Sequence, residues 1–319
     1  MNPRLRFVLR RLGLTIPVLL VMSVFVFLII RLVPGDPVRT MLGFRATDAN
    51  VAQVRQQLHL DDPLWVQYRD WLVALLHGDL GRDYVSRAQL TDLLAQRIPV
   101  TLELTLLSMG LAVGAGIPLG IRAAVGGRWA KRLTEGFVVF GVSVPDFWLG
   151  IMLVLIFAGT LAWLPPSGYV PFTEDPGGNL RYMALPVLTL AVGEAAYIAR
   201  TTRGAMLEVL GRPFVTYLRA KGTPERSVLY RHTLRNAATP IATVAGIQFG
   251  VLLGGAIVVE TLFALPGVGR LIVTAINQRN YPVVQAGLLV VALLFIVVSL
   301  VTDLVVGFID PRVADGERP

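Results

Sequence analysis

Few residues in this chain could take part in chemistry, and their types and positions exclude several kinds of active site. The sequence contains no cysteine, so neither a disulfide framework nor a thiolate metal site can form. Its three histidines, His59, His77 and His232, all lie outside the apolar runs. No apolar run therefore offers paired histidines to a metal ion or to a serine nucleophile.

Two weaker candidates for a reactive site remain. His59 with Asp61, Asp62 and Asp79 could bind a metal ion, but we interpret these residues as the solvated charges of a loop. Ser143 lies within an apolar run that supplies no matching base, so the sequence does not predict an intramembrane hydrolase. We expect no metal site in this chain.

The sequence also lacks a nucleotide-binding loop of the form G-x-x-x-x-G-K-[ST]. Lys221 precedes Gly222, whereas that loop needs the lysine after its glycine. We therefore predict that the chain is not an enzyme, does not hydrolyse ATP itself and holds no cofactor.

Acidic residues inside apolar runs are the remaining chemical signal. Asp146 lies ten residues into the run from Phe137 to Trp163, where a carboxylate is costly unless it faces a cavity or a partner. It is either a residue of a transport pathway or the structural partner of a buried arginine or hydroxyl. Pro145 beside it removes a backbone hydrogen bond and predicts an opening of the helix. Four other acidic residues lie toward run ends, where we expect structural roles: Glu103, Glu194, Glu260 and Asp303.

The elements that must position these residues are membrane spans. The chain has 319 residues, of which 54% are hydrophobic and 16% charged, and its mean hydropathy of +0.64 indicates a polytopic membrane protein. The fold class is all-α. Six candidate spans lie near Leu12–Ile30, Ile98–Ile121, Phe137–Trp163, Ala184–Ala199, Pro240–Val259 and Val283–Ile309. The fourth is short, so we expect it to extend to Met183 and past Arg200.

The N-terminal segment superficially resembles a secretory signal, because four arginines precede its apolar run. The run is 19 residues long, enough to cross a bilayer, and no small-residue cleavage pattern follows it. We therefore interpret residues 1–31 as a cytoplasmic N-terminus and an uncleaved first span. With this orientation the inside segments carry 18 lysines and arginines, against three in the two short outside loops, so both termini are predicted to be cytoplasmic.

Residues 32–97 form an external insertion in this prediction. Val51, Val54 and Leu58 repeat at helical spacing, and so do Trp65, Tyr68, Leu72 and Leu76, which predicts two amphipathic helices. A turn is expected at Pro34–Pro37. Residues 98–319 then form a core of five spans with a basic loop at 200–239.

Glycine and proline divide this basic loop into short helices. Gly211 and Pro213 predict a helix end and a new start, and Gly222 with Pro224 repeats the pattern, with Thr223 as the expected N-cap. A helix of about nine residues lies between them and is marginal alone in water. Phe214 and Leu218, four residues apart, share a face. We predict a docking element for another protein.

The run PFVTYLRAKG at Pro213–Gly222, followed by His232, Leu234–Ala237 and Pro240, resembles the coupling loop of ABC importer permeases. More narrowly, it is similar to the first permease subunit of the peptide and nickel importers, whose members also transport glutathione. Further matching strings are RRLG at 10–13, PGDPV at 34–38, HGDLG at 77–81, PVTLEL at 99–104, SVPDFWLG at 143–150, ETLFALPGVGRL at 260–271, YPVVQ at 281–285 and DPR at 310–312. The sequence departs from the family at Thr216–Leu218, where Arg, Thr and Ala are frequent, and at Asp146, which is usually uncharged.

The resemblance implies an inner-membrane permease that forms half of a pore for short peptides and works by alternating access. The implied partners are a homologous second permease, two ATPase subunits that bind ATP and Mg²⁺, and an external solute-binding protein. The helix would dock into the ATPase, with Phe214 and Leu218 as anchors and Arg219 and Lys221 steering toward acidic groups. The residues expected at this contact are Phe214, Val215, Tyr217, Leu218, Arg219, Ala220, Lys221 and Gly222. Nickel or glutathione import, or a self-contained channel or secondary transporter, are the alternatives.

Overall fold

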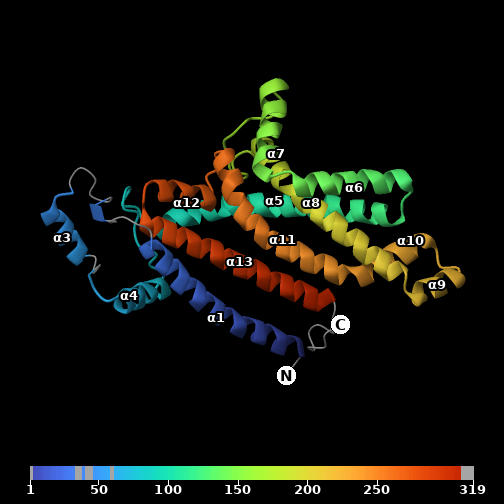
Figure 1. Ribbon diagram of the computed structural model, residues 1–319, viewed down its shortest axis with the longest axis horizontal. Helices are drawn as coiled ribbons and strands as arrows, with labels where there is room; N and C mark the ends of the chain where they lie inside the picture. Colours follow the sequence, from blue (N-terminus) through green and yellow to red (C-terminus); the bar gives the residue numbers. More distant parts are fainter. Residues whose placement is uncertain (1–2, 33–37, 40–45, 58–60, 310–319) are drawn as a thin grey trace. The chain divides into compact units, whose positions relative to one another are not determined.

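The computed structural model describes residues 3–32, 38–39, 46–57 and 61–309 (Figure 1). Its regular structure over these ranges is helical, which confirms the predicted all-α class. The expected turn at Pro34–Pro37, His59 and the string at 310–312 lie outside the described residues. The helices are α1 (Pro3–Leu32), α3 (Asp48–Gln57), α4 (Leu64–Leu76), α5 (Leu90–Val125), α6 (Arg128–Ser143), α7 (Asp146–Leu153), η2 (Val154–Thr160), α8 (Pro176–Leu210), α9 (Pro213–Ala220), α10 (Glu225–Ser227), η3 (Val228–Thr233), α11 (Leu234–Leu262), α12 (Val268–Asn277) and α13 (Tyr281–Ile309).

The chain forms two compact units. Unit 1 comprises Met1–Leu12, Leu102–Leu265 and Phe295–Pro319, and unit 2 comprises Gly13–Thr101 and Pro266–Leu294. The external segment thus groups with α12 and the first half of α13, which follow it far along the chain. The predicted boundaries at residues 31 and 97 instead separate the first span, the external insertion and the core of five spans, and this division remains a prediction.

Helix α8 is the centre of unit 1, where it contacts α6, α7 and α11 (Figure 1). Glycines bring two neighbouring backbones against it. A Cβ atom on Gly120 of α5 would lie 2.6 Å from the Ala199 carbonyl oxygen, and one on Gly141 of α6 would lie 2.7 Å from the Ala196 Cβ. Apolar residues gain little by leaving lipid for another helix, so close backbone contact at small residues is what holds such helices together.

The predicted third span is broken. Helices α6 and α7 meet at an angle of 105°, and α7 turns away from α6 in Figure 1. Pro145 has no amide hydrogen and forces Val144 into an extended conformation, with φ −88° and ψ 123°. The expected opening beside Asp146 is confirmed, although the straight 27-residue run is not.

Four described helices are long and apolar enough to cross a membrane, and the bent pair raises the number to five. They are α5, α8, the continuous segment Glu225–Leu262, and α13. The fourth predicted span does extend in both directions, since α8 has 35 residues. The apolar part of α1 that can be described, Gly13–Leu28, is shorter, so the sixth span stays a prediction.

Unit 2 contains both predicted external helices, α3 and α4. The face of α4 that packs against α1 only partly matches the predicted apolar stripe of Trp65, Tyr68, Leu72 and Leu76. Tyr68 and Trp71 pack against Phe27 of α1, with ring centroids 5.2 and 5.8 Å away, whereas Trp65 and Leu76 are 68% and 78% exposed. The two ends of the predicted stripe are therefore exposed, because only the aromatic residues in the middle of α4 pack against Phe27.

A hydrogen-bonded loop fastens the end of the external segment in unit 2. Asp83 accepts hydrogen bonds from the Val85 amide and the Ser86 hydroxyl, both at 2.7 Å, and from the side-chain amide of the buried Asn280. Burial alone would raise the pKa of Asp83, but these hydrogen bonds outweigh it and hold the pKa below the ordinary aspartate value. Asn280 lies between α12 and α13, so the loop joins segments that are distant in sequence.

Replacing Gly120 by valine should disrupt the contact between α5 and α8, because the added Cβ cannot fit beside the Ala199 carbonyl. We expect a loss of about 1–3 kcal/mol in stability, seen as a lower Tm of the purified protein in detergent. Gly114→Val is the matched control, since no atom of another helix lies within 4 Å of the position that a Cβ on Gly114 would take. Equal losses in both variants would contradict this explanation of the packing.

Asp83→Ala should lower the stability at pH 7 by about 1 kcal/mol, because hydrogen bonds from three donors are lost. The folded-state pKa is depressed, so the stabilisation is present above the unfolded pKa and is lost as the pH falls through the folded value. The Tm difference from the parent should therefore be constant from about pH 7 to 5 and shrink below about pH 4. Asp70→Ala, which removes an exposed ion pair with Arg69, should change the Tm much less. A difference that grows on acidification would contradict the assignment.

Candidate functional site

Helix α9 confirms the predicted short helix in the basic loop. It has eight residues, starts with Pro213 after the extended Arg212, and ends before Gly222, whose φ of +80° favours glycine. The next helix begins at Glu225 with Pro224 as its N-cap, so the expected N-cap at Thr223 is wrong by one residue. The proline is already extended, with ψ 134°, and therefore it is the last residue outside the helix.

The sequence predicted that Phe214 and Leu218 together would contact a partner, but the structure exposes a different pair of α9 residues. Val215 is fully buried and Leu218 is partly buried, whereas Phe214 and Tyr217 are 36% and 66% exposed. Helix α9 lies against η3, and this contact turns the Val215 side inward. The apolar pair that a partner could reach is therefore Phe214 with Tyr217.

An ion pair closes the turn that follows α9. The Arg219 guanidinium donates to both Glu225 carboxylate oxygens, at 2.7 and 3.1 Å. These hydrogen bonds raise the pKa of Arg219 and lower that of Glu225. Arg219 is thus occupied within its own loop, which differs from the expectation that it steers toward a partner. Lys221 and Ala220 remain exposed beside Gly222.

A small apolar core lies behind this loop and joins three spans of unit 1. Its members come from the ends of α5, α8 and α11: Ile121, Ala205, Met206, Val209, Ala237 and Ile241. Leu229 of η3 packs against this core. Because protein interiors are close-packed, a displacement of η3 would press on these helix ends.

Asp146, the candidate pathway residue, lies at the start of α7, where α8 and α11 approach it closely. A Cβ atom on Gly193 of α8 would lie 3.4 Å from its Oδ1, and one on Gly255 of α11 would lie 3.7 Å from its Oδ2. A larger side chain at either position would therefore reach the carboxylate. The two glycines thus leave the backbones of α8 and α11 close to the Asp146 carboxylate at the break in the helix.

Two further polar residues belong to this site, although neither was predicted as a site residue. Glu194 of α8 follows Gly193, which lies beside the Asp146 carboxylate, and it accepts a 3.0 Å hydrogen bond from the Gln248 side chain of α11. We name Asp146, Glu194 and Gln248 the acidic site. A glutamine in an otherwise apolar run was the signal that could have identified it.

Two other acidic residues in the spans have polar partners within the chain. Glu103 accepts a 2.7 Å hydrogen bond from the Tyr169 hydroxyl, and Asp303 forms a 2.8 Å ion pair with Arg11. Burial, and then the hydrogen bond to Glu103, raises the pKa of Tyr169, so its hydroxyl stays a donor at physiological pH. Glu260 is fully buried. In the part of the chain that the structure describes, no group of three or more His, Cys, Asp or Glu side chains could hold a metal ion.

Comparison with known proteins gives consistent matches over nearly the whole chain. Residues 116–315 match the family described as binding-protein-dependent transport system inner membrane component, and residues 4–105 match the N-terminal component of the same system. A putative peptide transport system permease protein of Brucella abortus is 41% identical over 307 residues, which cover 96% of this chain and 98% of that protein. A glutathione transport system permease protein of Salmonella typhimurium is 43% identical over 310 residues, covering 97% and 99%.

Solved structures support the fold at lower identity. The inward-facing MetNI methionine ABC transporter matches with a TM-score of 0.54 and 20% identity, over 68% of this chain and 96% of that one. The family match and the two relatives carry the assignment, and the structural match agrees with it. This chain belongs to the family of binding-protein-dependent transport system inner membrane components, the multi-pass inner-membrane permease subunits of ABC importers.

Proposed function

We propose that this chain is the permease subunit of an ATP-driven importer of short peptides and that it forms half of the translocation pore. The observation that carries the proposal is α9: a short helix with an exposed aromatic pair that lies against η3, whose Leu229 packs on a core that joins three spans. Relatives named for peptides and for glutathione, itself a tripeptide, support the solute class. A nickel chelate is the alternative within the family.

The proposed partners follow from the family. A homologous permease supplies the other half of the pore, two ATPase subunits bind and hydrolyse ATP with Mg²⁺, and an external binding protein delivers the solute. The excess of positive charge on the loop at 200–239 supports a cytoplasmic location for it and for both termini. Helix α9 would then meet the ATPase.

In this proposal the ATPase acts through the contacts behind α9. Phe214 and Tyr217 would fill a cleft on the ATPase, with Lys221 at the rim, and Val215 and Leu218 would hold α9 on its own chain. Gly222 and the ion pair of Arg219 fix the angle at which α9 leaves the loop. The ATPase must bind two arrangements of the spans with different strengths, because a contact of equal strength shifts nothing.

The same helices carry the acidic site. Helix α8 bears Glu194 and ends in the core behind α9, and α11 bears Gln248 and starts in that core. A tilt of either helix end would change the spacing of the carboxylates around Asp146. We propose that this site receives the cationic amino terminus of the peptide, since two carboxylates within a membrane span favour a cation.

Tyr217→Asp should weaken binding of the ATPase subunits by more than about tenfold, because a charge replaces an exposed aromatic anchor. Co-purification of the ATPase with the permease is the measurement, and membrane insertion should not change. Phe172→Asp, at an aromatic residue of similar exposure outside this loop, is the control.

Gly222→Val should reduce coupling, because valine does not readily adopt the positive φ of this position, whereas Gly211→Val, at φ −78°, should be tolerated. Full ATPase binding and uptake by both the Tyr217→Asp and the Gly222→Val variants would remove the coupling assignment.

Asp146→Asn should reduce uptake of dipeptides with a free amino terminus by about tenfold, and reduce uptake of N-acetylated dipeptides much less. The reason is that only the free terminus is a cation that the acidic site can bind. Uptake into proteoliposomes holding the complete complex is the measurement, and Glu194→Gln should act in the same direction. Asp303→Asn, which removes the ion pair with Arg11, is expected to affect both peptides equally. The same factor for both peptides in Asp146→Asn would leave Asp146 with a structural role.

A further inference from the structure

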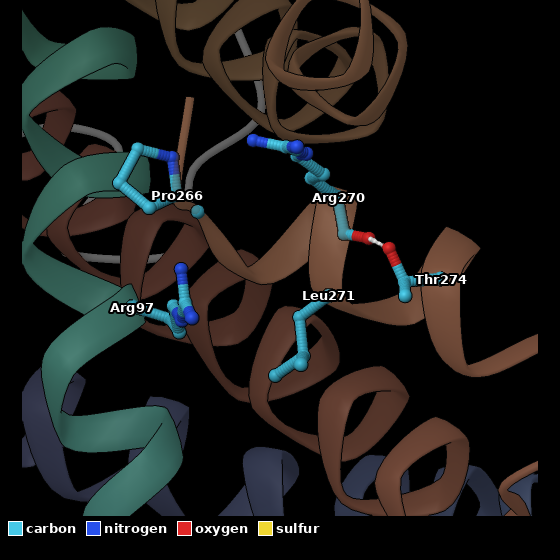
Figure 2. Close-up of a pocket in the computed structure, with 6 residues that line it drawn as sticks. Arg97, Pro266, Arg270, Leu271 and Thr274 are labelled. Atoms are coloured by element: carbon cyan, nitrogen blue, oxygen red, sulfur yellow. Dashed lines mark hydrogen bonds between the residues drawn. The ribbon is translucent and has the colours of Figure 1, made fainter. Parts of the chain in front are cut away.

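Unit 2 contains a pocket that the proposed function has not used. Its volume is about 240 Å³, and Figure 2 shows Arg97 of α5 and Arg270 of α12 on two sides of it, with Pro266 at its edge. Its lining residues are Arg97, Pro266, Gly267, Arg270, Leu271 and Thr274. None of these described residues is acidic.

A buried hydrogen bond fixes the geometry of this pocket. The Val268 amide at the start of α12 donates to the Thr101 hydroxyl of α5 at 2.9 Å. Arg97 precedes Thr101 by four residues on the same helix and therefore lies on the same face, toward Pro266 and Gly267. Beneath them, a core that includes Leu94 and Ile272 holds α5 against α12. The two arginines are thus presented by packed helices rather than by loops.

Arg97 is a partly buried, positively charged residue at the side of the pocket. Its Nε is buried and has no hydrogen-bond partner, and Arg97 forms no ion pair with any residue that the structure describes. The Thr274 hydroxyl already donates to the Arg270 carbonyl, at 2.9 Å. Arg97 and Arg270 both line the pocket, so an anion held there would lie beside two positive charges.

A carboxylate is the anion whose shape matches an arginine side chain. A guanidinium presents its N–H groups in a planar fork that matches the two oxygens of a carboxylate. Leu271 and Pro266 add an apolar wall, and a volume of about 240 Å³ exceeds that of a single carboxylate, since one water takes about 30 Å³ of liquid. An apolar side chain next to the carboxylate would also fit.

We infer that this pocket binds the C-terminal carboxylate of the transported peptide, with Arg97 inside the pocket and the exposed Arg270 at its mouth. The inference rests on the proposed function and deepens it. It gives the carboxyl end of the peptide a partner of its own, in unit 2.

The test uses the complete importer with its binding protein and ATPase subunits in proteoliposomes. Uptake of dialanine is compared with uptake of its C-terminal amide, which lacks the negative charge. Arg97→Gln should lower uptake of dialanine by about tenfold and leave uptake of the amide within about twofold, so the preference for the free acid collapses. Arg270→Gln should act in the same direction. Because Arg270 is exposed, this substitution should not disturb the packing of the protein.

Arg69→Gln is the matched control, since it removes one positive charge from unit 2 at an exposed residue that does not line the pocket. It should leave the preference unchanged. If both pocket variants lower the uptake of acid and amide by the same factor, or change neither, the inference is wrong; the first of these results would assign the arginines to contact with the binding protein. If the parent complex takes up no peptide at all, the proposed function fails, and this inference fails with it.

Discussion

The close approach of helix backbones around α8 is the constraint on which the rest of unit 1 depends. Lipid is as apolar as the side chains it would replace, so these helices associate through van der Waals contact and a few polar bonds. Gly120 and Gly141 remove the side chains that would separate α5 and α6 from α8. At Gly193 and Gly255 the missing side chains let the backbones of α8 and α11 lie close to the Asp146 carboxylate. The placement of glycine along α8 and its neighbours therefore contributes both to the tight packing and to the acidic site.

The break at Pro145 is the second determinant of the acidic site. A continuous helix would carry Asp146 through the apolar part of the span with its backbone fully bonded and its carboxylate beside lipid or a neighbour. The break turns the chain by 105° and places Asp146 in the first turn of α7, between α8 and α11. Carboxylates favour helix N-termini, where free amide groups point outward. The proline thus both interrupts the span and makes the position tolerable for a charge.

The loop that follows α8 is held in place on one side and exposed on the other. Val215 is buried, the Arg219–Glu225 ion pair closes the turn, and the core behind the loop contains residues of three spans. An exposed ion pair contributes little to stability, but here it limits the directions that α9 can take. A partner that moves α9 would therefore move the helix ends as well. Residues on the exposed side, Phe214 and Tyr217, are those that such a partner can reach.

The sequence by itself determined the features that depend on local chemistry: the all-helical membrane class from composition, the break at Pro145, and the short helix that begins at Pro213 and ends before Gly222. Proline and glycine act on their own backbone, so their effects can be predicted without knowing the neighbours. Tertiary structure alone decided which side of α9 is exposed, that Gln248 binds Glu194 across 54 residues, and that Arg97 lies beside the start of α12. These contacts join helices that are distant along the chain, and helical periodicity gives the face of one helix but not the helix that packs against it.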